Sequence, residues 1–134
     1  MTKFEFEHSV EGPASVEAVW ALWSDVDRWV EWDESLESVT LDGPFAEGSS
    51  GTMAIKGQGP IEFVLTSVEA GVGFVDETSV PGALLRFTHR VEKLAGGVRV
   101  THAVSIEGPR AEFLGPVVTA DLPDAVEALV KLAS

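Results

Sequence analysis

Residues 88–104, THRVEKLAGGVRVTHAV, decide the fold, because two runs of alternating apolar and polar residues flank one glycine pair. Runs of this length predict antiparallel strands, and the glycines predict a tight turn between them. A two-residue turn at Gly96-Gly97 pairs Ala95 with Val98 and fixes which side chains share a face. The stretch therefore predicts a β-hairpin with one apolar face and one polar face.

The apolar face of this hairpin carries two of the three histidines in the chain. With the turn at that place, Val91 pairs with His102. By the same count, His89 pairs with Val104. The two imidazoles then become diagonal neighbours with side chains about 7 Å apart or less. At that separation they could share a ligand, a water molecule or a proton.

The hairpin belongs to a longer series of strands. Turns that contain glycine or proline recur along the chain, and short segments rich in Val, Phe, Thr and Ile lie between most of them. This pattern is typical of consecutive antiparallel strands. The seven predicted strands cover residues 3–10, 35–42, 49–56, 61–69, 73–79, 83–94 and 97–107.

Helices are predicted at two places. In residues 14–24, ASVEAVWALWS, apolar side chains recur at helical spacing and Ser15 is a suitable N-cap, and a second short helix follows through residues 25–32. The C-terminal stretch from Ala111 also has apolar residues at helical spacing, which predicts a long helix with one apolar face. Pro116 and Pro123 are expected to kink or divide it.

The order of strand, two short helices, six strands and long helix predicts an α+β fold in a single domain, residues 1–134. In this arrangement a strongly curved, seven-stranded antiparallel sheet wraps around the C-terminal helix. One helix fills such a sheet incompletely. We therefore expect a cavity between the sheet and the helix, lined by inward-facing side chains.

The composition narrows the classes of partner. The net charge is −13, and residues 1–47 hold 12 acidic but only 2 basic side chains. Nucleic-acid backbones and anionic membrane surfaces are bound through clustered Lys and Arg that neutralise their phosphates, so neither nucleic-acid binding nor stable membrane association is expected. The chain has no cysteine, no signal-peptide pattern and no apolar run near the roughly 20 residues of a membrane span. These features predict a cytoplasmic protein and leave monomer and homodimer open.

Histidine and aromatic side chains that face inward are the candidate ligand contacts. His8 shares a strand face with Phe4 and Phe6, so all three histidines are predicted to face inward. A buried histidine is most often a core residue with both nitrogens hydrogen-bonded, but a neutral imidazole can also hold a ligand carbonyl or hydroxyl. The candidate ligand-binding residues are His8, Trp29, Trp32, Phe63, Phe74, Phe87, His89 and His102.

Other roles for these side chains stay open. His89 or His102 is a candidate general acid or base, because imidazole titrates near neutral pH. Zinc would require three imidazoles to converge on one point, and the alignment of the first strand with the last is not given by the pattern. We therefore predict neither a metal nor a cofactor. Asp76 would add a carboxylate to the cavity if the face of Phe74 is the buried one. Trp29 and Trp32 are expected at the cavity mouth or packed beneath the sheet.

The string VWALWSDVDRWVEWDESLESV (residues 19–39), the hairpin FTHRVEKLAGGVRVTHAVSIEGP (residues 87–109) and the final helix resemble the START-like, or SRPBCC, superfamily, and within it the polyketide cyclase/dehydrase and lipid-transport group. The resemblance spans nearly the whole chain in element order. It implies the helix-grip fold with a deep hydrophobic cavity, which serves lipid and hormone carriers as well as aromatic cyclases. By position, Trp29, Trp32, Phe87, His89 and His102 match the cavity side.

Two functions follow from the residues and the resemblance. The leading hypothesis is the binding of a small hydrophobic ligand, lipid-like, polyketide-like or aromatic, in the internal cavity. The alternative is a polyketide cyclase or dehydratase in which a cavity histidine acts as general acid or base. A protein-interaction module with an incidental cavity is a third possibility. A carrier would retain a bound ligand, an enzyme would form a product, and an interaction module would do neither.

Overall fold

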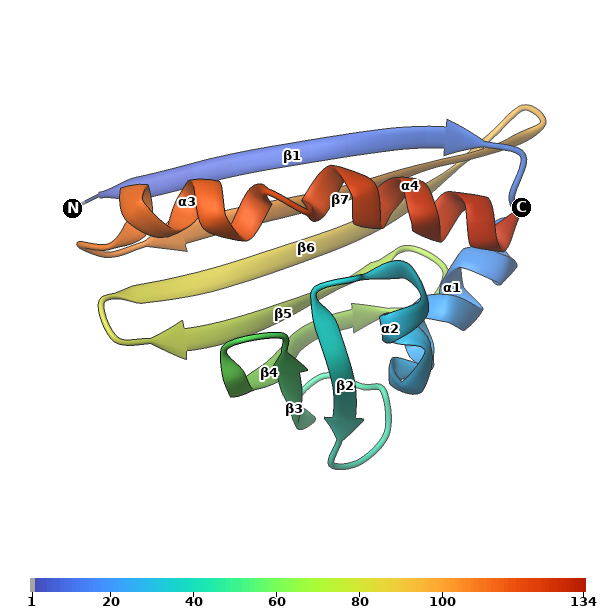
Figure 1. The fold of residues 1–134 in the computed structure, drawn as a ribbon. Coiled ribbons are helices and arrows are strands. Elements are labelled where there is room, and N and C mark those ends of the chain that lie inside the picture. The colour runs from blue at the N-terminus through green and yellow to red at the C-terminus, as the bar shows by residue number, and fades with distance from the viewer. Residues whose placement is uncertain (1) are drawn as a thin grey trace.

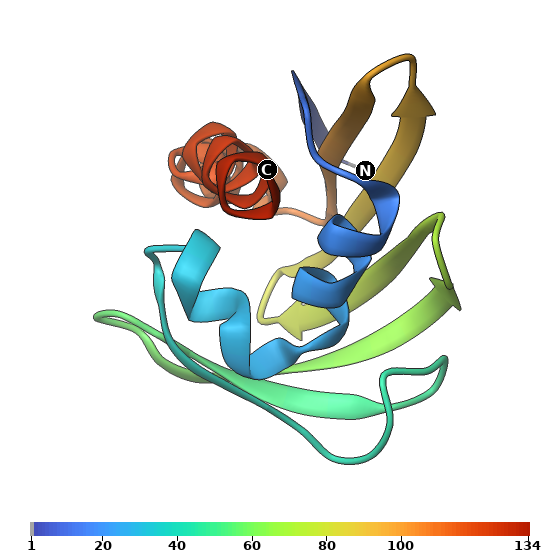
Figure 2. The same cartoon turned by 90° about the vertical axis from the view of Figure 1, so that its right-hand side faces the viewer.

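The computed structural model describes residues 2–134. One seven-stranded antiparallel sheet, in the order β1-β7-β6-β5-β4-β3-β2, curves around the helices, as Figure 1 and the end-on view in Figure 2 show. The strands are β1 (Lys3–Gly12), β2 (Leu36–Leu41), β3 (Ser50–Ile55), β4 (Gly59–Glu69), β5 (Gly73–Val80), β6 (Ala83–Leu94) and β7 (Gly97–Glu107). Each predicted strand is present, with ends displaced by two residues at most.

The curvature of the sheet has local causes in two strands. The pairing of β4 with β5 shifts register between Leu65 and Ser67, and the pairing of β2 with β3 shifts between Leu36 and Ser38. An extra residue on one strand bends that strand and increases its twist. The sheet therefore curls over the helices, and the residues on its inner side surround a common interior.

Alternation along the strands separates the interior from the solvent. In β1, residues alternate between exposed and half-buried, and Phe4, Phe6 and His8 are on the half-buried side. In β7 the even-numbered residues from Val98 to Ile106 are all buried. The faces deduced from the sequence are therefore the faces observed in these two strands.

The register of the β6–β7 hairpin differs from the prediction by two residues. Leu94 pairs with Gly97, so Ala95 and Gly96 form the turn, and Gly96 has the positive φ of 86° that the turn requires. Gly97 is needed for another reason: a Cβ there would collide with the backbone oxygen of Gly12 at the end of β1. A glycine pair in the sequence does not distinguish these two roles. As a result, His89 lies directly opposite His102 rather than diagonal to it.

The helices between β1 and β2 form a short cover over the open end of the sheet. Helix α1 covers Val16–Ser24, and Ser15 is its N-cap, as predicted. The Oγ of Ser15 accepts a hydrogen bond from the Ala18 backbone N–H at 3.1 Å. The second segment is a 3₁₀ turn, η1 (Val26–Arg28), followed by one helical turn, α2 (Trp29–Trp32). This short segment places the side chains of Trp29 and Trp32 in the buried core on the inner face of the sheet.

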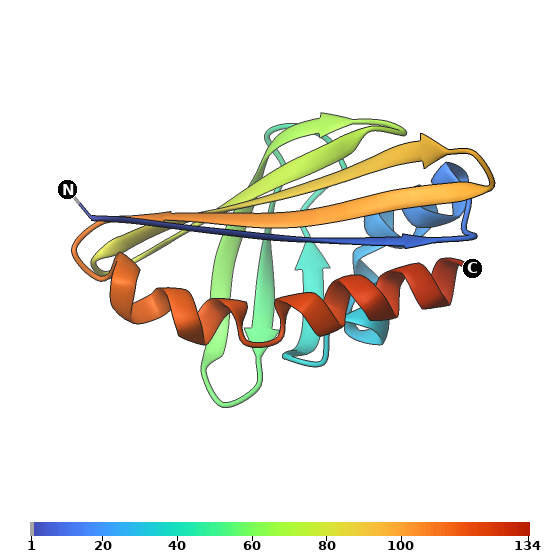
Figure 3. The ribbon, with the colours of Figure 1, turned by 90° about the horizontal axis from the view of Figure 1, so that it is seen from above.

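The C-terminal helix is divided, as its prolines predict. Helix α3 (Ala111–Thr119) contains Pro116, while Pro123 lies in the first turn of α4 (Leu122–Ala133), where a missing N–H is tolerated. Figure 3 shows α3 and α4 following each other almost in line beside β1 and β7. The division therefore interrupts the hydrogen bonding of the helix without reversing its direction.

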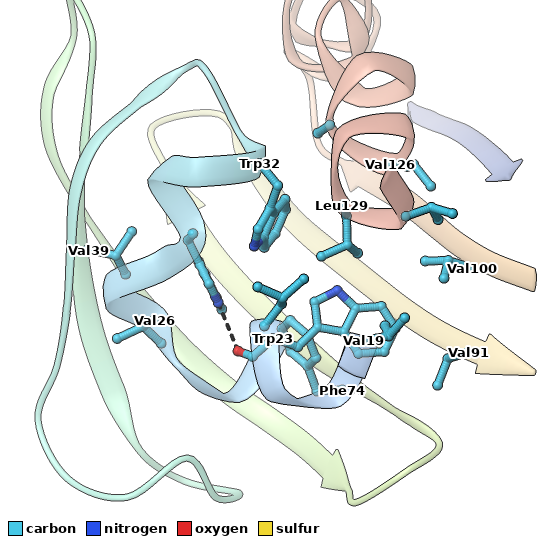
Figure 4. Close-up of a cluster of buried hydrophobic side chains, with 14 of the residues drawn as sticks. Val19, Trp23, Val26, Trp32, Val39, Phe74, Val91, Val100, Val126 and Leu129 are labelled. Carbon is cyan, nitrogen blue, oxygen red and sulfur yellow. Dashed lines mark hydrogen bonds between the residues drawn. The ribbon is translucent and has the colours of Figure 1, made fainter. Parts of the chain in front are cut away.

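The main core lies between α1, α2, α4 and the inner face of the sheet. Trp23 is fully buried in it, and Figure 4 shows Trp23 and Phe74 beneath Leu129 of α4. A second, smaller cluster forms where α3 packs on the ends of β6 and β7 through Ala111 and Ile106. Among residues 2–134, no helix is long and apolar enough to cross a membrane.

Candidate functional site

A cavity of about 590 Å³ is lined by residues of both hydrophobic clusters. The sheet contributes one wall, while α2, α3 and the beginning of α4 contribute the other. Most of its surface is apolar. The apolar residues that line it are Trp29, Trp32, Leu36, Met53, Ile55, Ile61, Val80, Leu85, Phe87, Ala103, Leu114, Val117, Val118, Leu122 and Ala125.

The polar lining residues fall into an exposed and a buried group, with the half-buried Asp33 and Ser35 between them. Glu34, Lys56, Gln58 and Asp121 are exposed and mark the end of the cavity that meets the solvent. The inner polar residues are buried: Asp76, Thr78, His89 and His102. The cavity thus has a charged entrance and an inner wall in which a few polar groups interrupt an apolar surface, as is usual for small-molecule sites.

The three histidines lie in one row across neighbouring strands. His8 of β1 pairs with His102 of β7, and His102 pairs with His89 of β6. The rings of His89 and His102 are 4.6 Å apart between centroids and meet edge to face. His8 is half-buried and does not line the cavity. Among residues 2–134, no three His, Asp or Glu side chains are arranged to hold a metal ion.

The orientation of His102 is set by Trp23. The indole Nε1–H of Trp23 donates a hydrogen bond to Nε2 of His102 at 3.3 Å, inside the core. Since Nε2 accepts, the ring hydrogen of the neutral imidazole is on Nδ1. Burial, with further contributions from His89 and His8, lowers the pKa of His102 well below its usual value. His102 is therefore a neutral hydrogen-bond donor at physiological pH.

His89 also carries its hydrogen on Nδ1, but its free nitrogen is an acceptor, whereas the free nitrogen of His102 is a donor. The Nδ1 of His89 is 3.3 Å from the carbonyl oxygen of Phe74, and a carbonyl only accepts, so Nδ1 carries the hydrogen and Nε2 keeps a free lone pair. The ring stacks on Phe74 at 3.9 Å between centroids, with an angle of 6° between the planes. Burial lowers the pKa of His89 to about 3, although the bond to Phe74 opposes this shift.

Asp76 lies beside His89 on the same wall. Its Oδ1 is 3.9 Å from Nδ1 of His89, which is too long for a hydrogen bond, and the neutral imidazole does not neutralise it. Burial raises the pKa of Asp76 to about 7, the negative charge of Glu77 contributes in the same direction, and a bond to its own backbone N–H acts against both. Near neutral pH the carboxyl group is thus divided between its protonated and ionised forms.

The structure separates the predicted site residues into two sets. Trp29, Trp32, Phe87, His89 and His102 line the cavity.

The remaining three do not line it. His8 lies beyond His102, while Phe63 and Phe74 are buried against Trp29, each with a centroid separation of 5.8 Å. The indole of Trp29 donates to the Trp23 carbonyl at 2.8 Å, so this ring is anchored in the core. Trp32 has no such anchor, and its ring is 5.6 Å from that of His102.

Thr78 was not singled out from the sequence, although a signal for it exists. It follows Phe74 and Asp76 at intervals of two in β5, so all three side chains share one face. Val75 and Glu77 occupy the other face and are half-buried. A single threonine at an inward position resembles many core threonines, and only the neighbouring helices show that a cavity lies in front of it.

The fold is the helix-grip fold of START-like and Bet v 1-like proteins. Norcoclaurine synthase from Thalictrum flavum has the same fold, with a TM-score of 0.78 at 14% sequence identity, and the match covers 98% of this chain and 93% of that one. The structure of Ara h 8.0201 gives a TM-score of 0.79 at 13% identity and covers 98% of both chains. The di-domain ARO/CYC StfQ from the steffimycin biosynthetic pathway gives 0.81 at 11% identity, with 98% of this chain and 50% of that one covered.

The sequence itself identifies the family. Residues 3–134 match the model of the polyketide cyclase/dehydrase and lipid transport family, and the chain belongs to that family. A comparison with curated proteins finds no match. The family and fold support a ligand-binding cavity, and they agree with the resemblance noted from residues 19–39 and 87–109.

Proposed function

We propose that the protein binds a small, largely apolar molecule in the cavity between the curved sheet and the C-terminal helices. The observation that carries this proposal is the cavity itself, about 590 Å³ in volume, whose inner wall is mostly aromatic and aliphatic. Burial of apolar surface would supply most of the affinity, at roughly 25 cal/mol per Å². The Nδ1–H of His102 and the free Nε2 of His89 would orient the ligand as donor and acceptor.

The first test is whether the protein retains a ligand. Native mass spectrometry of freshly purified protein should show a bound mass that is released on denaturation. The double variant His89→Gln/His102→Gln should retain less of it, because the two hydrogen-bonding groups are displaced. His8→Gln is the matched control, since His8 is in the same row of the sheet but does not line the cavity. An empty cavity that also takes up no added apolar probe would contradict the proposal.

A second candidate function is catalysis of the polyketide cyclase or dehydratase type. The family membership and the edge-to-face pair of His89 and His102 favour it. A general base works best when its pKa is near the working pH, and burial lowers the pKa of His89 to about 3. A neutral imidazole of this kind accepts a proton only weakly. Binding is therefore the better-supported function.

The two functions predict different results for the same variant. A linear poly-β-ketone thioester mimic incubated with an enzyme would give a cyclised product or one that has lost water, detectable by mass spectrometry. The double histidine variant would then lose turnover and keep most of its binding. In a carrier, the mimic would be recovered unchanged and only its affinity would fall.

A further inference from the structure

Three buried polar atoms lack a hydrogen-bond partner within residues 2–134, and all three belong to residues of the cavity wall. They are Nε1 of Trp32, Oδ1 of Asp76 and Oγ1 of Thr78. Buried polar side-chain atoms in folded proteins almost always have a partner, because an unpaired group loses its hydration without compensation. The three atoms have almost no accessible surface, so a bound molecule would complete their hydrogen bonds once their side chains turn toward it.

These atoms belong to one continuous polar strip on the inner wall. Asp76 and Thr78 are two residues apart in β5, so their side chains leave the same face of the sheet. His89 connects them to the rest, with its Nδ1 at 3.9 Å from Asp76 Oδ1 and its ring at 4.6 Å from that of His102. The ring of Trp32 then lies 5.6 Å from that of His102. A ligand that fills the cavity would pass along this strip.

The chemistry of the strip opposes charged ligands. An anionic group, such as a fatty-acid carboxylate, would approach Asp76 without a cation to neutralise it. Within residues 2–134, Lys56 is the only Lys or Arg of the wall, and it lies at the exposed entrance. An ammonium group would pair with the ionised form of Asp76 and with the free Nε2 of His89. It would leave the indole N–H of Trp32 and the Nδ1–H of His102 without an acceptor, because both groups only donate. An uncharged hydroxyl or carbonyl oxygen accepts from these donors, and a hydroxyl also donates to Asp76.

We propose that Trp32, Asp76 and Thr78 form a hydrogen-bonding subsite for an uncharged oxygen group, hydroxyl or carbonyl, on an otherwise apolar, ring-containing ligand. This inference rests on the proposed binding function and names the class of ligand. The ring is expected because Trp29, Trp32 and Phe87 give the wall flat aromatic surfaces. The three polar groups would fix the position of the oxygen, and the aromatic groups would supply the area.

The test uses four probes with one ring system: naphthalene, 2-naphthol, 2-naphthoate and 2-naphthylmethylamine, each titrated by calorimetry at pH 7. The hydroxyl group makes 2-naphthol more soluble in water than naphthalene, so apolar burial alone would favour naphthalene. We expect the protein to bind 2-naphthol about fivefold more tightly than naphthalene, as a well-placed hydrogen bond would provide. The two charged probes should bind more weakly than 2-naphthol.

Variants assign this preference to the subsite. Thr78→Val keeps the size of the side chain and removes its hydroxyl, and Trp32→Phe removes the indole N–H. Each should reduce the preference for 2-naphthol over naphthalene to less than about twofold. Thr40→Val is the control, because Thr40 is exposed on β2 and outside the cavity. Thr78→Val carries the test if Trp32→Phe fails to fold.

The outcomes separate the two proposals. Equal affinity for naphthalene and 2-naphthol, tightest binding of a charged probe, or a preference that survives Thr78→Val would overturn the subsite and leave the binding function standing. Failure of all four probes to bind would overturn both.

Discussion

At the scale of single residues, burial shifts the pKa values of neighbouring groups in opposite directions. The pKa of Asp76 rises to about 7, while that of His89 falls to about 3. In both cases the uncharged form is favoured in the folded state, because the charged form loses its hydration. The titratable groups close to Asp76 are His89 on β6 and Glu77 next to it in β5. The interior is thus built to hold neutral polar groups.

The pH dependence of stability should reveal Asp76. Between about pH 4 and 7 the unfolded chain has an ionised Asp76 whereas the folded protein keeps the proton, so this residue makes the free energy of unfolding fall as pH rises. His89 acts in the opposite sense between about pH 3 and 6.5. Asp76→Asn removes only the first contribution. The variant should therefore gain stability relative to wild type as pH rises from 4 to 7, measured by urea unfolding.

A matched control for this prediction is Glu62→Gln, which removes an exposed carboxylate on the neighbouring strand β4. Its stability difference from wild type should vary much less with pH. If the Asp76→Asn difference were constant from pH 4 to 7, the carboxyl group would be ionised in the folded protein and the assignment would fail.

The facing direction of side chains could be predicted, whereas their partners could not. Alternation alone indicated the inward face of His102. The hydrogen bond from Trp23 joins residues 79 positions apart, and no local pattern indicates it. The place of Phe74 shows the same limit: it was a candidate ligand contact, although the alternation left the inward face of its strand open, and it is covered by His89 and Trp29 and does not line the cavity. The alternation along a strand predicts which face of the sheet a side chain is on. Which residues it contacts there depends on the packing of segments far apart in the sequence.

At the scale of elements, helix α3 packs closely on β1 at Gly115, although glycine has a low helical propensity. A Cβ at Gly115 would come within 2.5 Å of the Phe4 ring on β1. Glycine in a helix interior is about 1 kcal/mol less favourable than alanine, so this position exchanges helix stability for close packing on the sheet. The approach of α3 to β1 also places Leu114 and Val118 on the cavity wall.

Gly115→Ala should therefore destabilise the protein by about 1 to 2 kcal/mol, since overpacking outweighs the gain in helical propensity. Thermal and urea unfolding would measure the loss. In a Phe4→Ala background the ring is absent, and the same substitution should be neutral or stabilising. Additive losses in the double variant would show that the contact between these two residues is not the cause.

The division of the C-terminal helix could be predicted from its prolines, but the shape of the space beside it could not. Pro123 in the first turn of α4 is a local signal for a helix start. The second segment after β1 gave a weaker signal, and only one turn of it, Trp29–Trp32, is α-helical. Whether these pieces leave a cavity depends on the bulges in β2 and β4, which bend the sheet and have no clear sequence pattern.

At the scale of the whole molecule, the net charge of −13 opposes the compact state. Glu5 and Glu7 are exposed on the outer face of β1 and lie opposite Ser105 and Ala103, which carry no charge. By contrast, Arg99 donates hydrogen bonds to Glu11 at 2.8 and 3.0 Å. The N-terminal strand therefore carries repulsion that its neighbour only partly relieves.

Added salt should stabilise the protein by screening this repulsion. Raising NaCl from about 10 mM to 1 M shortens the screening length from about 30 to 3 Å, and the thermal midpoint of wild type should rise. The rise should be smaller in Glu5→Gln/Glu7→Gln, which already lacks two of the repelling charges. Glu11→Gln is the comparison variant. It also removes a negative charge from β1, but that charge belongs to an exposed ion pair with Arg99. An identical rise in wild type and the first variant would argue against repulsion at β1.

The alternation of side chains along the strands has an evolutionary consequence. The backbone hydrogen bonds of the strands are the same for many inward side chains, so the lining can change while the fold persists, provided that the interior stays apolar and well packed. Solved structures that share only 11 to 14% identity with this chain still superpose with TM-scores of 0.78 to 0.81. Chains with this architecture can thus differ at most of their positions and still fold in the same way.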